Sequence, residues 1–138
     1  MYEKLLVAVD FSDMSTRVVV ATKELAKGTG AEVFVLHLRE REVLGRLGLV
    51  ANEGEQEAID KVKAIVDDLR AAGVTAEGAV LEAIYGHAAR EILEAAKKQD
   101  AGVIVMGSRG MSELTALVVG STAHKVLHLA DRPVLIVH

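Results

Sequence analysis

Four short apolar runs constrain the fold of this chain more strongly than any other feature of its sequence. They occupy residues 5–9, 33–38, 103–106 and 134–137. Polar residues do not alternate with apolar ones in these runs, which only His37 interrupts. Strands of this kind have both faces covered, as in a parallel sheet flanked by helices. A fifth segment, residues 74–83, mixes polar and apolar positions around Gly78 and predicts a strand nearer an edge of the sheet.

Between the runs, apolar residues recur with a helical period. We expect Ser12 or Asp13 to cap the first helix, Gly28 and Gly30 to end it, and Pro133 to break the last one. The order βαβαβαβαβ predicts right-handed crossovers and a three-layer α/β/α sandwich in one domain, residues 1–138. The four apolar series are Met14, Val18, Ala21 and Leu25; Ala58, Val62, Ile65, Val66 and Leu69; Ala88, Ala89, Ile92, Leu93 and Ala96; and Ala123, Val126, Leu127 and Ala130.

The composition excludes several classes of function. The chain has 16 Lys and Arg residues against 20 Asp and Glu, a net charge of −4, and 3% aromatic residues, so it lacks the basic, stacking surface of a nucleic-acid binder. It has no cysteine, which removes disulfides, thiolate catalysis and zinc–thiolate sites. No window reaches the ~18 apolar residues of a bilayer span, and the start does not resemble a signal peptide. We expect a soluble, cytoplasmic protein with no nucleic-acid or membrane partner.

Candidate chemistry lies at the ends of two predicted strands, where open α/β sheets bind their ligands. The first strand ends at Asp10, followed by Phe11 and Ser12, and the fourth ends in residues 106–110, Met-Gly-Ser-Arg-Gly. After nine more residues, Gly120-Ser121-Thr122 opens the last helix. The first N–H groups of a helix have no intrahelical acceptor, so with two hydroxyls and the helix dipole they favour anionic oxygens. We expect Gly107 and Gly110 to let the backbone approach a ligand, and Arg109 to add positive charge.

Two common phosphate-binding motifs are absent. No Gly-x4-Gly-Lys-Ser/Thr sequence occurs, which excludes a P-loop. Gly28-Thr29-Gly30 precedes a predicted strand, whereas the dinucleotide fingerprint follows one.

The spacing Gly107-x2-Gly110-x9-Gly120-Ser121, after a strand that ends Val105-Met106, resembles the nucleotide motif of the universal stress protein family in its ATP-binding branch. The likeness covers nearly the whole chain. Residues 4–12 are similar to the family's opening strand and turn, and residues 35–38 to its second strand. Residues 86–92 are similar to the start of its third helix, and residues 132–137 to its closing strand.

The resemblance implies a Rossmann-like fold, also described as adenine nucleotide alpha hydrolase-like, with five parallel strands in the order 3-2-1-4-5. It further implies that ATP or another adenine nucleotide binds where the first and fourth strands meet, with Mg or Mn bridging phosphate oxygens. By resemblance, the adenosine end would contact Ala8, Val9, Asp10 and the backbone of Leu38. The ribose and inner phosphates would contact Met106, Gly107, Ser108, Arg109 and Gly110. The outer phosphates would contact Gly120, Ser121 and Thr122. The family often has Pro where Ala8 stands.

The function indicated is a nucleotide-dependent regulatory switch. The resemblance suggests a homodimer joined through the last strand, since residues 134–137 at an exposed edge would otherwise favour aggregation. Two alternatives stay open. One is a slow metal-dependent ATPase, for which no convincing base, and hence no catalytic residue, is identified. The other is an interaction module that has lost nucleotide binding.

Three further features have ordinary explanations. Residues 40–54 predict a partly helical surface excursion, with a flap over a ligand or a dimer contact as the alternative. His124 and His128 lie four residues apart, a spacing that can chelate a metal, but without a third ligand we expect a helix face and no protein-built metal site. His37 is expected to be a hydrogen-bonded core or rim residue.

Overall fold

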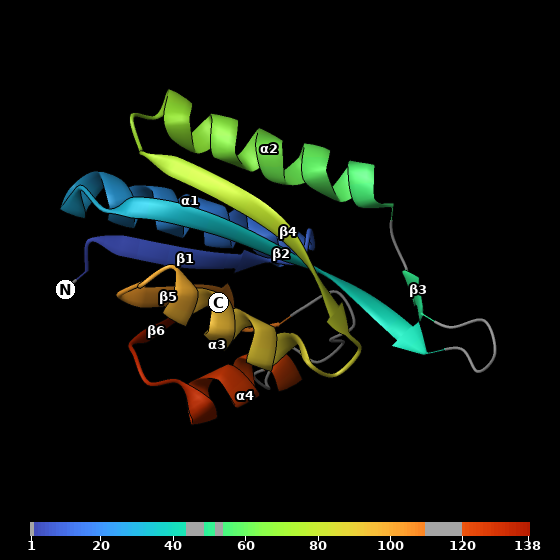
Figure 1. Ribbon diagram of the computed structural model, residues 1–138. Coiled ribbons are helices and arrows are strands. Elements are labelled where there is room, and N and C mark those ends of the chain that lie inside the picture. The colour runs from blue at the N-terminus through green and yellow to red at the C-terminus, as the bar shows by residue number, and fades with distance from the viewer. Residues whose placement is uncertain (1, 44–48, 52–53, 110–119) are drawn as a thin grey trace.

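The fold of this protein is given by a computed structural model that describes residues 2–43, 49–51, 54–109 and 120–138. Strands and helices alternate along the chain, with one additional short strand after the second (Figure 1). In chain order the elements are β1 Lys4–Val9, α1 Asp13–Thr29, β2 Glu32–Val43, β3 Leu49–Ala51, α2 Glu55–Ala71, β4 Ala76–Ile84, α3 Ala88–Lys98, β5 Val103–Gly107, α4 Ser121–Leu129 and β6 Val134–Val137.

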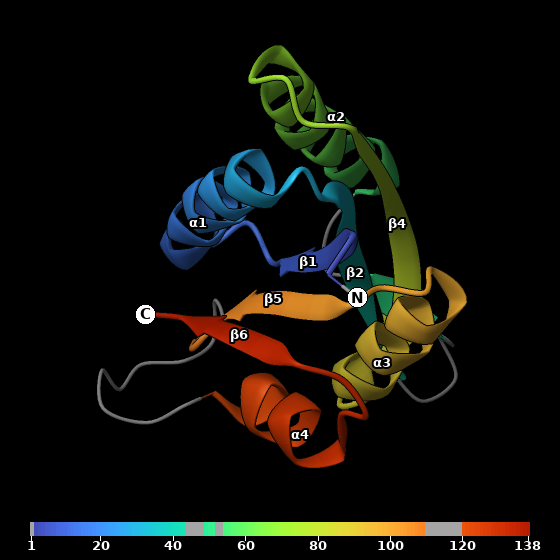
Figure 2. The same cartoon turned by 90° about the vertical axis from the view of Figure 1, so that its left-hand side faces the viewer.

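The sheet has the predicted topology. Five parallel strands are ordered β4-β2-β1-β5-β6, which is the order 3-2-1-4-5 when β3 is set aside. Figure 2 shows α1 and α2 on one face of this sheet and α3 and α4 on the other. The central position of β1, between β2 and β5, explains why its sequence is apolar without alternation: both of its faces are covered.

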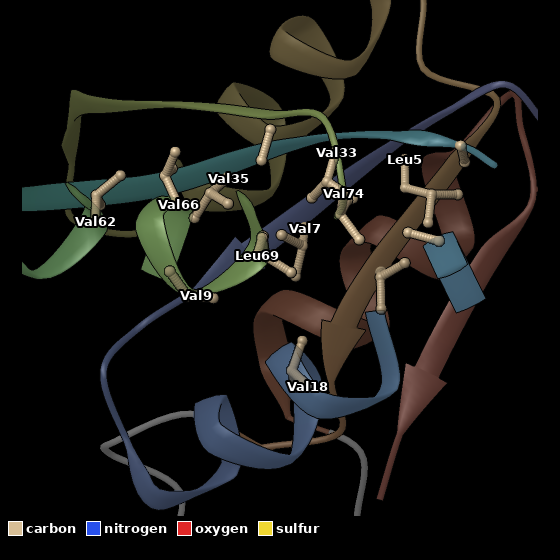
Figure 3. Close-up of a cluster of buried hydrophobic side chains, with 14 of the residues drawn as sticks. Leu5, Val7, Val9, Val18, Val33, Val35, Val62, Val66, Leu69 and Val74 are labelled. Atoms are coloured by element: carbon tan, nitrogen blue, oxygen red, sulfur yellow. The ribbon is translucent and has the colours of Figure 1, made fainter. Parts of the chain in front are cut away.

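Two apolar cores fill the space between the sheet and the two helix layers. On the α1/α2 side, Leu5, Val7 and Val9 of β1 pack with residues such as Val18 and Leu69 (Figure 3). The other core alternates with the first along each strand; its members include Leu6, Leu36, Ile92, Ile104, Met106 and Val126. Each fully buried side chain of this size contributes roughly 1.5–3 kcal/mol from removal of its apolar surface from water.

The ends of α1 differ in part from the prediction. Gly30 ends the helix in the left-handed region, with φ 76°, and its N–H donates to the carbonyl of Ala26 at 2.8 Å. Gly28 lies within α1, so its predicted role as a stop is wrong: the chain remains helical to Thr29. Ser12 occupies the N-cap position but makes no side-chain capping bond, because its hydroxyl is used elsewhere.

The apolar series of α4 was also predicted only in part. Ala123 and Val126 are buried as expected, but the side chain of Leu127 is 45% exposed. Ala130 lies beyond the last helical residue, in an extended conformation. The helix is therefore shorter than its apolar pattern suggests.

The expected helical excursion at residues 40–54 is wrong where the structure describes it. β2 continues to Val43, and β3 pairs with it antiparallel, with Arg41 opposite Ala51 and Val43 opposite Leu49. Residues 44–48 and 52–53 of that stretch lie outside the described residues. β2 and β4 thus run together beyond the end of β1, since β1 stops at Val9, opposite His37. We call residues 38–41 of β2 and 81–84 of β4 the ledge.

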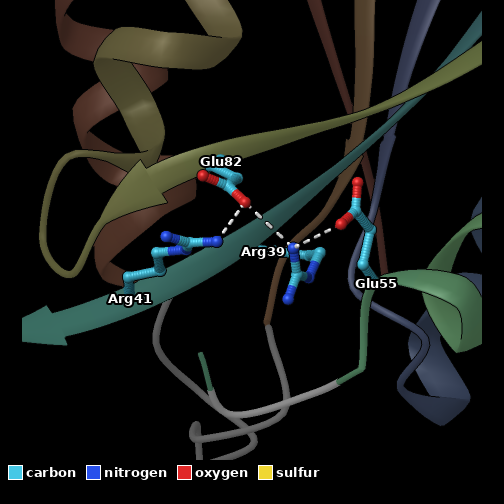
Figure 4. A network of polar contacts seen from close by, with 4 residues as sticks. All are labelled: Arg39, Arg41, Glu55 and Glu82. Carbon is cyan, nitrogen blue, oxygen red and sulfur yellow. Dashed lines mark hydrogen bonds and ion pairs between the residues drawn. The ribbon is translucent and has the colours of Figure 1, made fainter. Parts of the chain in front are cut away.

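Opposite charges across the two strands stabilise the ledge (Figure 4). Glu82 of β4 accepts hydrogen bonds from Arg39, at 3.0 Å, and from Arg41. Glu55 at the start of α2 lies 3.9 Å from the same nitrogen of Arg39. The whole Arg39 residue is only 6% exposed, so its charge needs these partners.

Among the described residues, no helix combines the length and the hydropathy that crossing a bilayer requires.

Candidate functional site

The end of β5 and the start of α4 meet at the carboxyl edge of the sheet. The N–H of Gly120 donates to the carbonyl of Ser108 at 2.5 Å, although the two residues are far apart in sequence. The N–H of Ser108 in turn donates to the carbonyl of Val137 at the end of β6, at 2.9 Å. The two glycine-containing segments singled out in the sequence therefore converge, as the motif requires.

The residues predicted to contact the nucleotide divide between the two faces of the sheet. Ala8, Leu38 and Met106 belong to the core on the α3/α4 side, the same side as α4. Asp10 directly follows β1, and β1 lies between β2, which contains Leu38, and β5. Ser108 is buried directly after β5. A ligand at this edge would therefore lie toward the α3/α4 face.

Val9 and Gly107 have roles that the sequence did not indicate. The side chain of Val9 is buried in the opposite core, so only its backbone faces the strand end. A Cβ at Gly107 would lie 2.5 Å from Cγ of Met14 and 3.4 Å from Cγ2 of Val18. The close packing of α1 on β5 therefore favours glycine there. That the Gly107 backbone also approaches a ligand stays a prediction.

Asp10 is held in a small hydrogen-bonded cluster. Its Oδ1 accepts from the N–H of Ser12 at 3.0 Å, from the Ser12 hydroxyl at 2.5 Å and from the Ser15 hydroxyl at 2.9 Å. The backbone N–H of Asp10 donates to Oγ of Ser15 at 3.1 Å. Sequence reasoning missed Ser15; the spacing Asp-x-Ser-x2-Ser was the available signal.

Phe11 connects Asp10 to Ser12 in an unusual backbone conformation, with φ 62°. Its ring stacks on the ring of His37 with 3.9 Å between centroids, and Nζ of Lys61 lies 5.1 Å from the Phe11 centroid. His37 is buried, as predicted, and its Nδ1 lies 2.7 Å from the carbonyl oxygen of Val9. Because a carbonyl only accepts, Nδ1 carries the hydrogen in this contact.

The start of α4 has the features of an anion site. Gly120 is buried and occupies the N-cap position without a side-chain cap, and the first turn contains no acidic residue. Ser121 is exposed and Thr122 is half-buried. Because the Gly120 N–H is already bonded to Ser108, it is not available to an anion. Arg109 is half-buried beside this site, and Gly110 lies outside the described residues.

The donor set fits an adenine nucleotide better than a bare metal ion. A carboxylate such as that of Asp10 can accept from hydroxyl or amino groups, and the N-terminus of a helix can donate to phosphate oxygens. His124 and His128 are exposed on α4 with ring centroids 6.5 Å apart. Within the described ranges, no group of three His, Cys, Asp or Glu side chains could hold a metal.

Comparisons with known proteins agree over the full length of the chain. Residues 1–138 match the sequence pattern of the Universal stress protein family. Universal stress protein YxiE of Bacillus subtilis is 36% identical over 152 residues, covering 99% of this chain and 99% of the relative. A universal stress protein of Thermus aquaticus is 35% identical over 140 residues, covering 99% of each chain.

A solved structure carries the comparison to three dimensions. The universal stress protein of Archaeoglobus fulgidus in complex with dAMP is 28% identical to this chain. The two superpose with a TM-score of 0.74, covering 99% of this chain and 98% of the other.

Proposed function

The chain belongs to the universal stress protein family, and we propose that it binds an adenine nucleotide, first of all ATP, as a regulatory switch in the cytoplasm. The observation that carries this proposal is the hydrogen bond between Gly120 and Ser108, which brings the α4 start to the strand end next to β1. The dAMP complex of the Archaeoglobus fulgidus relative supports an adenine nucleotide as the ligand class.

The adenosine portion would lie against the end of β1 and the ledge. Ala8 and the backbone of Val9 would form part of its wall, the Leu38 backbone would meet the adenine edge, and Asp10 would accept hydrogen bonds from it. These groups lie on or next to neighbouring strands β1 and β2, so sheet hydrogen bonds fix their spacing.

The phosphates would lie between β5 and α4. Hydrogen bonds from neutral or charged donors to phosphate oxygens are charge-assisted and among the stronger ones available, about 1.5–3 kcal/mol each. A bound Mg or Mn ion would supply positive charge that neutralises the phosphates. The residues proposed around the ribose and inner phosphates are Met106, Gly107, Ser108, Arg109 and Gly110, and those around the outer phosphates are Gly120, Ser121 and Thr122.

Nucleotide binding could act as a switch because it would tie β5 to α4 through the ligand. Two or three such contacts amount to a few kcal/mol, the order needed to change a two-state population substantially. β6 lies at the sheet edge beside β5, and Ser108 is bonded to its end. We propose that a second copy of this chain pairs through β6 and responds to the state of this region.

Calorimetric titration with Mg-ATP, followed by an assay of phosphate release, tests the proposal against both alternatives. Binding without turnover supports the switch. Multiple turnovers would indicate a slow ATPase. Absence of detectable ATP binding would indicate an interaction module. Size-exclusion chromatography with light scattering tests the dimer.

Two variants locate the site. Gly120→Val is expected to abolish ATP binding while the protein remains folded, because the side chain would project toward the phosphates. Asp10→Ala is expected to weaken adenosine and ATP alike, because both share the adenosine contacts. Gly28→Val is a matched control: Gly28 is exposed, and a Cβ there meets nothing within 4 Å. ATP binding by Gly120→Val at the wild-type affinity would contradict the assigned motif.

A further inference from the structure

Ser15 makes the contact that joins Asp10 to the body of α1. The residue lies in the first turn of α1 and is only 7% exposed. Its hydroxyl donates to Oδ1 of Asp10 at 2.9 Å and accepts from the N–H of Asp10 at 3.1 Å. One hydroxyl group therefore holds both the side chain and the backbone of Asp10.

The contacts from Ser12 cannot replace this one. Ser12 lies in the same short turn as Asp10, two residues further on, so its N–H and hydroxyl move with that turn. Ser15 belongs to a 17-residue helix that packs on both β1 and β5. It fixes the turn relative to the sheet, whereas Ser12 shapes the turn itself.

Ser15 also differs from the other buried hydroxyl of α1. Thr22 is completely buried, and its hydroxyl donates to the carbonyl of Val18 within the same helix, at 2.7 Å. That bond satisfies a polar group and reaches no other element. The Ser15 hydroxyl leaves its own helix and ends on the carboxylate that the proposed site uses.

We propose that Ser15 is a positioning residue that holds the Asp10 carboxylate in its nucleotide-binding orientation. This inference rests on the proposed function, because it concerns how Asp10 meets the adenosine portion. Ordering a side chain only when the ligand arrives lowers affinity, and a hydrogen bond formed beforehand removes that loss. Ser15 supplies it from a rigid element.

A double-mutant cycle tests this inference. Affinities for Mg-ATP and for adenosine are measured calorimetrically with wild type, Asp10→Ala, Ser15→Ala and the double variant. We expect Ser15→Ala to weaken both ligands about five- to tenfold, the equivalent of one hydrogen bond. In the Asp10→Ala background the same change should alter ATP affinity less than about twofold, because Ser15 then has no carboxylate to hold.

Thr22→Val is the matched control, since it removes a buried hydroxyl from the same helix without touching Asp10. It should change the melting temperature and leave both affinities unchanged. If Ser15→Ala fails to fold, Ser15→Cys places a weakly bonding thiol in the same position and enters the same cycle.

The outcomes separate this inference from the proposed function. If wild type binds no adenine nucleotide, both are wrong. Binding by wild type that Asp10→Ala weakens and Ser15→Ala leaves unchanged would overturn the role of Ser15 alone. An equal loss from Ser15→Ala with and without Asp10 would show that Ser15 acts on binding independently of that carboxylate, and would also overturn it.

Discussion

The ring of Phe11 stacks on the ring of His37, and this contact offsets an unfavourable backbone conformation. The ring centroids are 3.9 Å apart and the planes are inclined by 27°. Phe11 has φ 62°, a region that costs a residue with a side chain about 1–2 kcal/mol. Burial of the ring against His37 and beneath Lys61 opposes that cost.

Two substitutions at Phe11 separate these effects. Phe11→Ala removes the stacking but keeps the backbone cost, whereas Phe11→Gly removes both. We expect both variants to be less stable than wild type, with Phe11→Gly more stable than Phe11→Ala by about 1 kcal/mol. Urea denaturation measures the difference, and equal stability of the two variants would argue against strain at this position.

Gly107→Ala should destabilise the protein by about 1–3 kcal/mol, because its Cβ would overlap Cγ of Met14. Met14→Ala also costs stability, but it removes the overlapping atom. The cost of Gly107→Ala should therefore be smaller in the Met14→Ala background, as measured by denaturant unfolding. Gly28→Ala, at an exposed helical position, serves as the control and should be neutral or slightly stabilising. Additive costs would show that the Met14 contact does not impose the glycine.

Glu82→Gln should destabilise the ledge by about 1–3 kcal/mol. The Arg39 side chain is 7% exposed, and its ion pair with Glu82, at 3.0 Å, is shorter than its pair with Glu55, at 3.9 Å, so loss of the Glu82 charge weakens the compensation of a buried cation. Glu57→Gln removes one member of the exposed pair with Lys61, in which both side chains are about half exposed, and should cost less than about 0.5 kcal/mol. Thermal unfolding of the two variants provides the comparison; similar losses would mean that burial of Arg39 does not matter.

The pair Asp131–Arg132 predicts a pH dependence. The hydrogen bond from Nε of Arg132, 2.8 Å long, lowers the pKa of Asp131 below its ordinary value of 3.8. Because the folded-state pKa is the lower one, the stabilisation is complete above that ordinary value and is lost as the pH falls through the folded-state pKa. Asp131→Asn should therefore narrow the difference in stability between neutral pH and about pH 3.

Arg132 also has a second role, which does not involve Asp131. Its Nη1 donates to the carbonyls of Ala96 and Ala101, at 3.0 and 2.8 Å, and so joins the end of α3 to the segment before β6. Arg132→Lys should lower stability by about 1–3 kcal/mol across the whole pH range, since an ammonium group cannot reproduce the fork. Calorimetric melting between pH 3 and 8 distinguishes this uniform loss from the acid-limited effect at Asp131.

The parallel sheet could be predicted from the residues because burial on both faces leaves a local sign: an apolar strand without alternation. The strand order 3-2-1-4-5 was predicted only through the family resemblance. The length of β2 could not be predicted, because Arg39 and Arg41 resemble loop residues in the sequence. Only the structure shows that Glu82 on another strand neutralises them. The packing constraint at Gly107 could not be predicted for a similar reason, because only the position of α1 shows which atoms a Cβ would meet. Ser15 was missed although the spacing Asp-x-Ser-x2-Ser was available, because that spacing alone does not show which hydroxyl reaches the Asp10 carboxylate.

The ledge decides in which direction a ligand could transmit its presence. Its two strands are paired up to Arg41 opposite Ile84, so strand pairing holds that boundary in place without a ligand. A boundary held by strand pairing would move little when a ligand binds. For the proposed switch, we therefore expect displacement on the opposite side, where Ser108 connects α4 to the last strand, and hence at the edge of the described sheet that β6 forms.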